Sequence, residues 1–326
     1  MTTSYSDIDT YASCPQRFYY RDRLRLQAKK RNPRMYEGTL AHTGLQEYYL
    51  AKREGRWPEP YHAIWESVDT RLMFSDEMLT AEVLAQNVAG WLEGYFAKYD
   101  DQWEILHVEE EFEVGLDSGH IVTFTPDLVI RDENGDVWVV DHKTTAAVPQ
   151  DGIPFADLQA LLYVSGVRAL YPECKGFIFN RIRKKLPTRP KLVKNGSKVA
   201  YLKTIDTTYE ILKDFLVTEA PHLVDDIDHR RRLAELRDQG DRYLWREYIA
   251  VTPATVTNVL NDVIARLMLM DRDEEFPRTM QSGYRGCEGC EFQSLCRADL
   301  LDWDVERTIE IEYEPRDPKN PYEEAE

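Results

Sequence analysis

A run of apolar residues that ends in a short charged motif constrains this chain most. Trp138 to Val140 lead directly into the motif Asp141 to Thr144. An unbroken apolar run predicts a strand that is buried on both faces. Because side chains alternate along a strand, Asp141 and Lys143 should project from the same face. The motif therefore predicts an acid and an amine side by side at the edge of a core.

A second carboxylate, Asp127, should join them through a hairpin. Residues Glu133 to Asp136 contain Asn-Gly, a strong hairpin signal. A two-residue loop would place Asp127 opposite His142, whereas a three-residue loop with Gly135 in the left-handed conformation places it opposite Asp141. We expect the three-residue form, with the two carboxylates about 5 Å apart. Such a pair repels unless it shares a proton or holds a cation, either the nearby lysine or a divalent metal.

The elements around this hairpin predict a mixed α/β fold. Strand patterns appear between residues 103 and 114, helical periodicity returns over residues 155–170, and Gly176 to Phe179 is typical of a further buried strand. Gly38 to Tyr49 predicts a helix, and residues 61–99 predict one or two more. An order of strand, strand, strand, helix, strand gives a mixed sheet flanked by helices.

Two predicted helices carry polar residues that could face a site. His42 lies beside the apolar face of its helix, where a histidine is more often structural than a ligand. Gln159 and Tyr163 are four residues apart and so share one helix face. An ordinary amphipathic helix would explain them, but a glutamine among leucines also indicates a position that faces a site.

Charge and length limit the class of protein. The formal net charge of -17 argues against general coating of nucleic acid, although local basic patches stay possible. A length of 326 residues suits one large domain with insertions or two modest domains. We expect no membrane span and no signal peptide, and hence a cytoplasmic protein. Residues 310–326 predict an acidic, partly disordered tail.

Two basic stretches stand out in this acidic sequence. Residues 17–34 mix arginines and lysines with tyrosines, and residues 180–198 contain no acid. Prolines and Asn195-Gly196 make the second stretch a loop or loose hairpin. Both could simply be solvated surface. Beside a carboxylate site, however, the second stretch would be suited to follow a nucleic-acid backbone.

The cysteines indicate a metal rather than a disulfide. Cys287, Cys290 and Cys296 form a tight trio, and in a cytoplasmic protein this spacing is typical of metal binding. A fourth thiolate would complete either a zinc site or a 4Fe–4S site. Cys14 and Cys174 are the candidates for it. Cys174 precedes a predicted buried strand and is expected to be structural.

Taken together, these motifs resemble the RecB-like branch of the PD-(D/E)XK nuclease superfamily. The sequence is similar to members with an iron–sulfur staple, such as the CRISPR-associated adaptation exonucleases and the AddB nuclease domain. The motifs that carry the resemblance occur in the family's order: Cys14, Gly38 to His42, Asp127, Asp141 to Lys143, Gln159 to Tyr163, and the trio Cys287, Cys290 and Cys296.

The resemblance implies a restriction-endonuclease-like core and a metal site. It implies that His42, Asp127, Asp141 and the backbone carbonyl of His142 bind Mg²⁺ or Mn²⁺, and imidazole would favour Mn²⁺. Lys143 would act with the two aspartates in catalysis. It also implies a 4Fe–4S cluster, with zinc as the alternative, held by Cys14 and the trio.

The resemblance also implies contacts to DNA, and it has limits. Gln159 and Tyr163 would position the strand near the metal, and we expect Arg183, Lys184 and Lys185 to bind substrate. Family members often carry glycine where this chain has Phe124. The family pattern does not account for the long stretch that follows Lys184.

These expectations divide the chain as follows. We predict an N-terminal segment at 1–37, a nuclease core at 38–183 with a helical insertion at about 57–100, an insertion with the basic loop at 184–250, a C-terminal helix and cysteine cluster at 251–309, and the acidic tail at 310–326.

The function predicted is that of a metal-dependent DNA exonuclease, in recombination, repair or processing of DNA ends. Its partners would be DNA ends or single strands, and possible protein partners are recombination, helicase or CRISPR adaptation proteins. One alternative is an iron–sulfur scaffold that binds DNA ends while a partner cuts. Another is a zinc-stapled interaction module, which would leave the carboxylates without a role.

Overall fold

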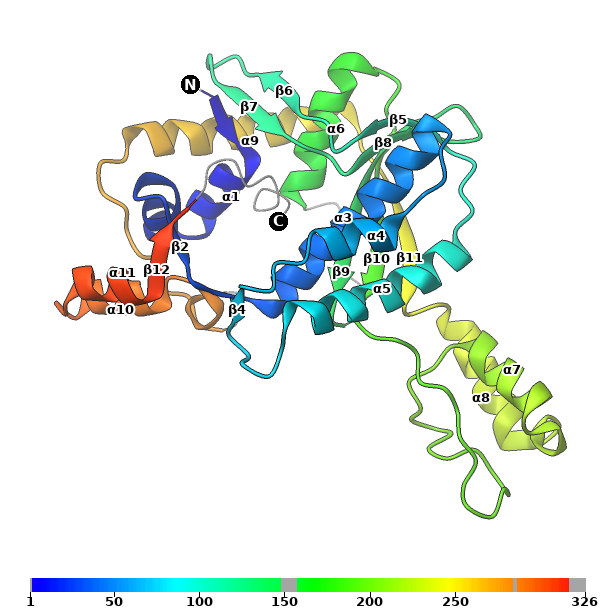
Figure 1. Ribbon diagram of the computed structural model, residues 1–326. Coiled ribbons are helices and arrows are strands. Elements are labelled where there is room, and N and C mark those ends of the chain that lie inside the picture. Colours follow the sequence, from blue (N-terminus) through cyan, green and yellow to red (C-terminus); the bar gives the residue numbers. More distant parts are fainter. Residues whose placement is uncertain (1, 148–156, 284–285, 317–326) are drawn as a thin grey trace.

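The computed structural model describes residues 2–147, 157–283 and 286–316. Its centre is a mixed sheet whose five strands lie in the order β11 (Leu244–Ala250), β10 (Gly176–Arg183), β9 (Val137–Thr145), β8 (Leu128–Arg131) and β5 (Glu104–Val108). Strands β9 and β10 are parallel, and the other neighbours are antiparallel. The predicted mixed α/β fold is confirmed (Figure 1).

Helices cover both faces of this sheet (Figure 1). On one face, the side chains of Leu128, Val140 and Ile178 pack against three helices: α3 (Pro33–Glu54), α4 (Pro60–Glu66) and α5 (Ala81–Lys98). On the other face, Val129, Val139 and Phe177 pack against α1 (Tyr5–Ser13), α6 (Leu158–Leu170) and α9 (Pro253–Arg272). Burial on both sides explains why these strands are apolar without alternation.

A small sheet extends the second layer. It pairs β1 (Thr2–Ser4) with β7 (Ile121–Phe124), and β7 with β6 (Phe112–Gly115). Strand β7 leads directly to Asp127, so the packing of Phe124 against the core fixes where the chain enters the site.

A separate cluster joins the two ends of the chain. It contains Tyr20, Leu26, Phe292, Leu295 and Tyr313. The elements that contribute are η1 (Tyr19–Arg23), β2 (Leu26–Ala28), α10 (Gln293–Leu300), α11 (Val305–Glu312) and β12 (Tyr313–Pro315). In the chain, α2 (Pro15–Phe18) precedes η1, and η4 (Cys287–Gly289) lies shortly before α10. Strand β12 pairs with β2, so residues 310–316 of the predicted tail are ordered, and residues 317–326 lie outside the described range.

The region after β10 forms a module outside both layers (Figure 1). An extended loop leads to α7 (Tyr209–Thr218), η3 (Pro221–Leu223) and α8 (Ile227–Gln239) before the chain returns in β11. The helices pack around their own apolar cluster, which includes Leu212, Phe215 and Leu236. We call residues 184–243 the arm.

Element boundaries show where local signals were misjudged. Helix α3 begins at Pro33, five residues before the predicted start at Gly38, because Asn32 accepts a hydrogen bond from the backbone of Arg34 and caps the helix. Strand β4 (Met73–Phe74), which pairs with β3 (Lys30–Arg31), lies within the predicted helical insertion at about 57–100. Helix α6 begins at Leu158, and the predicted start at Phe155 falls outside the described residues.

Candidate active site

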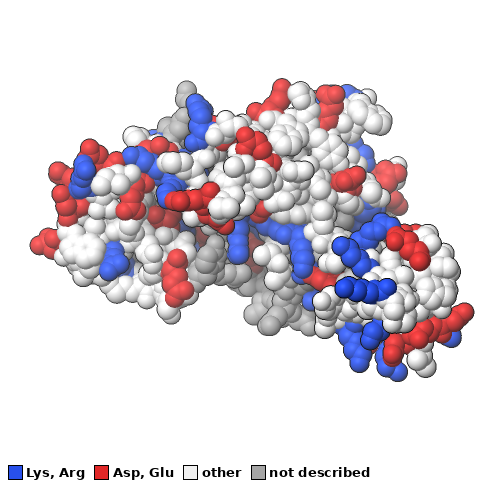
Figure 2. Space-filling view, turned by 60° about the horizontal axis from the view of Figure 1, so that its bottom comes forward, with Lys and Arg blue, Asp and Glu red and all other residues white. Residues whose placement is uncertain are grey.

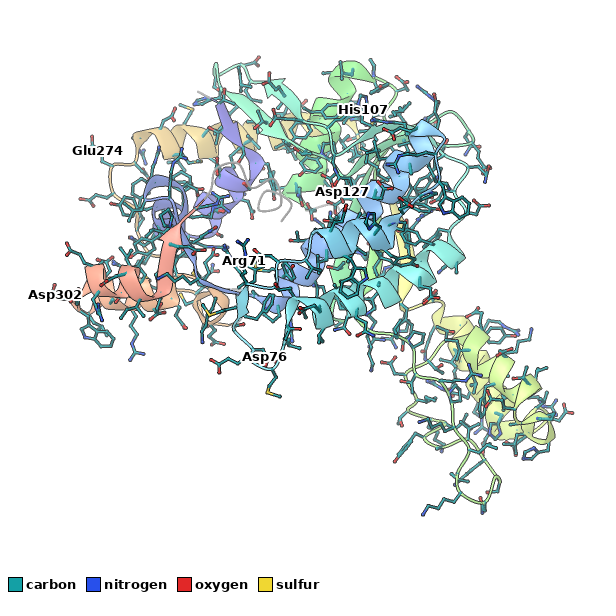
Figure 3. The ribbon with its side chains drawn as sticks, viewed as in Figure 1. Arg71, Asp76, His107, Asp127, Glu274 and Asp302 are labelled. Atoms are coloured by element: carbon teal, nitrogen blue, oxygen red, sulfur yellow. The ribbon has the colours of Figure 1, made fainter. Side chains whose placement is uncertain are left out.

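The hairpin of β8 and β9 brings Asp127 and Asp141 to the same edge of the sheet. Leu128 pairs with Val140, so Asp127, the preceding residue, comes opposite Asp141. Gly135 has φ +83 and its N–H donates to the carbonyl of Asp132 at 2.9 Å, which gives the three-residue loop. The predicted register is confirmed. Both aspartates are buried, at 6 % and 2 % exposure. Figure 3 labels Asp127 among the side chains of the fold.

A chain of polar contacts runs from Asp141 into helix α6. The ammonium of Lys143 lies 3.0 Å from Asp141 Oδ2 and donates to Gln159 Oε1 at 2.6 Å. Gln159 Nε2 donates in turn to the hydroxyl of Tyr163 at 2.9 Å. The structure thus brings Asp141, Lys143, Gln159 and Tyr163 into one chain of contacts. Because they are four residues apart, Gln159 and Tyr163 lie on the same face of α6, and Gln159 on this face contacts Lys143 of β9.

Phe124 occupies the position at which family members often carry glycine, and Gly166 makes room for its ring. The ring of Phe124 stacks on Tyr163, with ring centroids 5.0 Å apart and an interplanar angle of 18°. It fits because Gly166 on α6 has no side chain, since a Cβ there would come within 2.1 Å of the Phe124 ring. Phe124 thus supports Tyr163 instead of disrupting the site.

His42 and Glu109 approach Asp127 from two other elements. His42 Nδ1, from α3, lies 3.3 Å from Asp127 Oδ1 and 3.9 Å from Glu109 Oε1. One donor atom from each of the three residues lies within 4.8 Å of the others. Among the described residues no other set of three histidine, cysteine or acidic side chains does so. Carboxylates with an imidazole are a suitable ligand set for Mn²⁺ or Mg²⁺.

Glu109 was missed at the sequence level. It follows β5 in the left-handed region, with φ +46, and its N–H donates to the carbonyl of Asp127 at 3.1 Å. A non-glycine residue with this conformation is uncommon and marks a place where the surroundings fix the backbone. The available signal was an acid directly after a strand, which is weak because residues 109–111 are all glutamates.

The acids of the site have displaced pKa values because charges are crowded in a buried place. Burial raises the pKa of Glu109 to about 7, with Asp127 adding to the rise against the opposing effect of His42. Burial also raises the pKa of Asp141 to about 6, although Lys143 opposes it. For Asp127, His42 outweighs burial and lowers the pKa to about 2. A divalent cation would relieve this crowding.

His142 ties the site to a polar network beneath it. Its backbone N–H donates to Asp127 Oδ2 at 2.5 Å, while its ring nitrogen Nδ1 contacts Asn180 at 2.6 Å. Asn180 is fully buried and also accepts from Arg246 at 3.2 Å. Arg246 makes two contacts with Asp101, at 2.5 and 2.7 Å. The ring of His142 therefore contacts the buried network, whereas its backbone N–H contacts Asp127 in the site.

The predicted cysteine ligands come from both ends of the chain. Cys14, Cys287 and Cys290 line one groove, and Cys290 and Cys296 adjoin the apolar cluster that joins the chain ends. Burial and then the neighbouring Cys14 thiol are among the causes that raise the pKa of Cys290 and Cys296. Cys174 is buried elsewhere, with its Sγ 3.7 Å from the carbonyl of Gly176.

A single groove connects these cysteines to the carboxylates. His42, Asp127, Asp141, Lys143, Gln159 and Tyr163 line it together with basic residues: Arg17, Arg21, Lys29, Lys30, Arg31, Arg34, Arg71, Lys184 and Arg316. Several of these cations pair with acids, such as Arg17 with Glu291 at 3.0 Å. Figure 2 shows lysine and arginine side chains along the hollowed part of this face.

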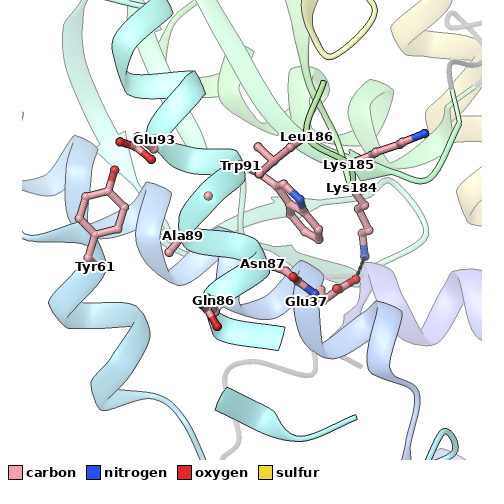
Figure 4. A pocket seen from close by; sticks show the side chains of 11 residues that line it. Glu37, Tyr61, Gln86, Asn87, Ala89, Trp91, Glu93, Lys184, Lys185 and Leu186 are labelled. Atoms are coloured by element: carbon pink, nitrogen blue, oxygen red, sulfur yellow. Dashed lines mark ion pairs between the residues drawn. The ribbon is translucent and has the colours of Figure 1, made fainter. Parts of the chain in front are cut away.

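The three cations predicted to bind substrate already have internal partners. Arg183 pairs with Asp206 through two contacts, at 2.9 and 3.0 Å, and Lys185 contacts the same carboxylate at 2.7 Å. Lys184 donates to the carbonyl of Arg34 and lies 3.9 Å from Glu37 Oε2 (Figure 4). Of the three, Lys184 lines the groove. A distant acid such as Asp206 could not be paired with them from sequence spacing.

The fold and this site are typical of metal-dependent nucleases. In these enzymes, acids on adjacent strands and a lysine lie close together at one edge of a sheet. A model of the PD-(D/E)XK nuclease superfamily matches residues 2–297, and the chain belongs to that superfamily. Nucleases of this superfamily use divalent metal ions and act on DNA. No curated protein matches the chain.

Two solved structures match the chain at low identity. A structure described as a putative exonuclease from Eubacterium rectale is 13% identical, with a TM-score of 0.42, covering 86% of this chain and 85% of that chain. The crystal structure of SSO0001 is also 13% identical, with a TM-score of 0.33, covering 91% of this chain and 86% of that chain. In the described residues, no helix is long and apolar enough to span a membrane.

Proposed function

We propose that this protein is a metal-dependent DNA exonuclease that processes DNA ends in recombination or repair. The observation that carries the proposal is the convergence of Asp127, Asp141 and Lys143 in a groove lined by cations. Hydrolysis of a phosphodiester requires neutralised phosphate oxygens and a nucleophile formed at neutral pH. These residues supply both requirements together with a divalent metal.

The metal ligands we propose are His42, Asp127, Asp141 and the backbone carbonyl of His142, with Glu109 as a further carboxylate. The donor set fits, since His42, Glu109 and Asp127 already offer atoms within 4.8 Å of one another. A bound Mg²⁺ or Mn²⁺ supplies a Lewis acid that lowers the pKa of water and offsets the charge on phosphate. Burial, followed by the neighbouring carboxylates, raises the pKa of Glu109 and of Asp141, and a divalent cation would favour the ionised form of both.

Lys143 is the residue that we assign to the transition state. Its ammonium is held by Asp141 and Gln159, so it is oriented before substrate arrives. A fixed cation stabilises charge that develops on the phosphate without reorganisation. Gln159 and Tyr163 orient Lys143 and form the wall along which the DNA strand lies.

For the cysteines we propose one site, formed by Cys14, Cys287, Cys290 and Cys296. Cys14, Cys287 and Cys290 line the groove, and Cys296 adjoins the apolar cluster that joins the chain ends. Burial opposes the ionisation of Cys14, but backbone N–H groups of Thr279 and Arg17 outweigh burial and lower the pKa of Cys14. Four thiolates suit a 4Fe–4S cluster or zinc. Either would crosslink the two chain ends beside the DNA groove.

End-labelled DNA tests the function directly. Linear single-stranded and double-stranded DNA, labelled at the 5′ or 3′ end, is incubated with wild type or with Lys143→Ala in Mn²⁺, Mg²⁺ or EDTA. We expect progressive shortening from a terminus with metal, no cleavage in EDTA, and resistance of closed circles. Cut circles would overturn the exonuclease assignment. Equal activity of Lys143→Ala would expose a contaminant and favour the non-cleaving DNA-end scaffold.

A further inference from the structure

The arm, residues 184–243, is a folded unit set apart from the catalytic core. Its two helices pack mainly against each other around Leu212, Phe215 and Leu236. In Figure 1 it extends from the edge of the sheet, beyond β10 and β11. A surface loop needs no core of its own, so this cluster argues against an unstructured linker.

The base of the arm is fixed firmly to the core. Asp206 accepts hydrogen bonds from Arg183, Lys185 and Tyr243, which brings the outgoing and returning chains together. Lys98 on α5 contacts Asp241 at 2.7 Å. Bidentate contacts between arginine and carboxylate fix direction as well as distance. A surface on the arm is therefore held in a defined position relative to the groove.

The outgoing loop of the arm carries unbalanced positive charge. Residues 184–205 contain seven cations and no acid: Lys184, Lys185, Arg189, Lys191, Lys194, Lys198 and Lys203. The first three have partners within the protein. The last four are exposed and form no ion pair with any residue that the structure describes. Figure 2 shows lysine and arginine side chains over this module, at the right.

On helix α8 of the arm, unlike on its loop, several cations lie beside acids. On α8, Arg231 lies 3.3 Å from Asp228 and Arg232 lies 3.1 Å from Glu235, and Arg230 is beside Asp225. Cations with local acids contribute little net potential, whereas unpaired cations attract a polyanion. Lys213, Arg237 and Arg242 also form no ion pair with a described residue, but the loop holds the larger group of unpaired cations, and no acid lies among them in the sequence.

The same loop offers an aromatic surface. Tyr201 is 84% exposed, although tyrosine usually buries part of its ring. Exposed aromatic rings among lysines are the pattern by which proteins bind nucleic-acid strands, because the rings stack on bases and the lysines contact phosphates.

The loop begins at the rim of the catalytic groove. Lys184 lines the groove and also a second pocket, which α3 and α5 form with the start of the arm (Figure 4). The carboxylate of Glu37 and the carbonyl of Arg34 hold its ammonium there. A DNA strand that leaves the groove on this side therefore meets the lysines of the arm.

We propose that the loop of residues 191–203 is a second DNA-binding surface that holds the phosphate backbone of the substrate outside the catalytic groove. This inference rests on the proposed function, since it takes the strand in the groove to be DNA. It assigns the insertion a role in retaining long substrates between successive cleavages. The chemistry recognised is the phosphate backbone, without base sequence.

The test compares two double variants within the arm. Lys194→Ala/Lys198→Ala removes unpaired cations, and Arg230→Ala/Arg231→Ala removes equally exposed cations that have local acids. Both are made in the Lys143→Ala background so that DNA stays intact during binding. Affinity is measured against salt for single strands of about 30 nucleotides and about 6 nucleotides, the second short enough to occupy only the groove.

We expect the lysine variant to lower the salt dependence for the long strand by about 1.4 in slope, or about 0.7 for each lost phosphate contact. The short strand and the arginine variant should behave as the background does. An unchanged slope, or an equal change for the short strand, overturns the inference. In the cleavage-competent protein, the lysine variant should keep its rate on saturating short DNA and release long DNA after fewer cuts.

The same data separate this inference from the function on which it rests. If wild type cleaves DNA and the slope is unaffected by the lysines, the arm assignment fails alone. If no DNA is cleaved and the lysine-dependent slope persists, the exonuclease proposal fails and the arm remains a DNA-binding surface. Equal melting temperatures of the two double variants show that the fold is intact.

Discussion

Replacing Glu109 with glutamine tests whether the site holds its metal through a carboxylate that the motif lacks. Glutamine keeps the size of the side chain and removes the charge that lies near His42 and Asp127. A neutral amide is a poorer ligand for a hard cation. At pH 8 we expect metal affinity to fall about tenfold to a hundredfold, or about 1.4 to 2.7 kcal/mol.

The pH dependence of metal binding gives a sharper expectation. Burial raises the pKa of Glu109 to about 7, so the ionised fraction rises from about 0.1 at pH 6 to about 0.9 at pH 8. A metal must displace the bound proton, so affinity falls as pH falls. Glu109 alone therefore contributes about a tenfold change in affinity between pH 6 and pH 8. Asp127, with its pKa lowered to about 2, contributes none in this range.

Titration of metal-free protein with Mn²⁺, followed by calorimetry at pH 6, 7 and 8, measures this difference. The ratio of the Mn²⁺ affinity at pH 8 to that at pH 6 should be about tenfold smaller for Glu109→Gln than for wild type. His42 must also lose a proton in both proteins. Because Asp127 and then Glu109 raise the pKa of His42 against burial, the loss of Glu109 lowers the pKa of His42 and reduces the pH dependence further. Glu110→Gln is the matched control, because Glu110 pairs with Arg53 and His107 at the surface. A variant at Glu109 with the full wild-type pH dependence would refute the assignment.

Three further predictions follow from the same contacts. Lys143→Ala should reduce cleavage at least about a hundredfold while Mn²⁺ affinity, measured by calorimetry, stays within a few-fold. Cys14→Ser should abolish the visible absorbance of anaerobically purified protein, if iron is bound, whereas Cys174→Ser should leave it intact; zinc would instead be seen by metal analysis. Arg246→Met should lower the free energy of unfolding by about 3 to 5 kcal/mol, measured in urea, because Asp101 is left buried without its partner.

Local sequence signals were sufficient for the centre of the site. The Asn-Gly turn and the pairing rules of a hairpin determine that Asp127 faces Asp141, and helical spacing determines that Gln159 and Tyr163 lie together. In each case the relevant residues are close in sequence, and one periodicity governs them. The start of α3 also had a local signal, Asn32 before proline, which was overlooked.

Contacts between distant segments could not be predicted in this way. Glu109 joins the site because β5 ends beside the start of β8, and nothing in its local sequence distinguishes it from Glu110 and Glu111. Arg183 and Lys185 looked free because their partner, Asp206, is about twenty residues away in sequence and is brought close by the fold of the arm. The sequence identified the basic loop, but its cations that form no ion pair with a described residue begin at Lys191, after the three residues that were predicted to bind substrate.

A chain of buried polar contacts connects the strand that returns from the arm to the active site. The chain returns from the arm in β11, and Arg246 on this strand reaches Asn180 and Asp101 inside the core. Asn180 contacts the ring of His142, whose backbone N–H holds Asp127. Buried polar groups of this kind must all be satisfied, because an unpaired member costs more than the pair contributes. Any exchange or removal of the arm must therefore preserve β11 and Arg246, or the peptide beside the proposed metal ligands loses its support.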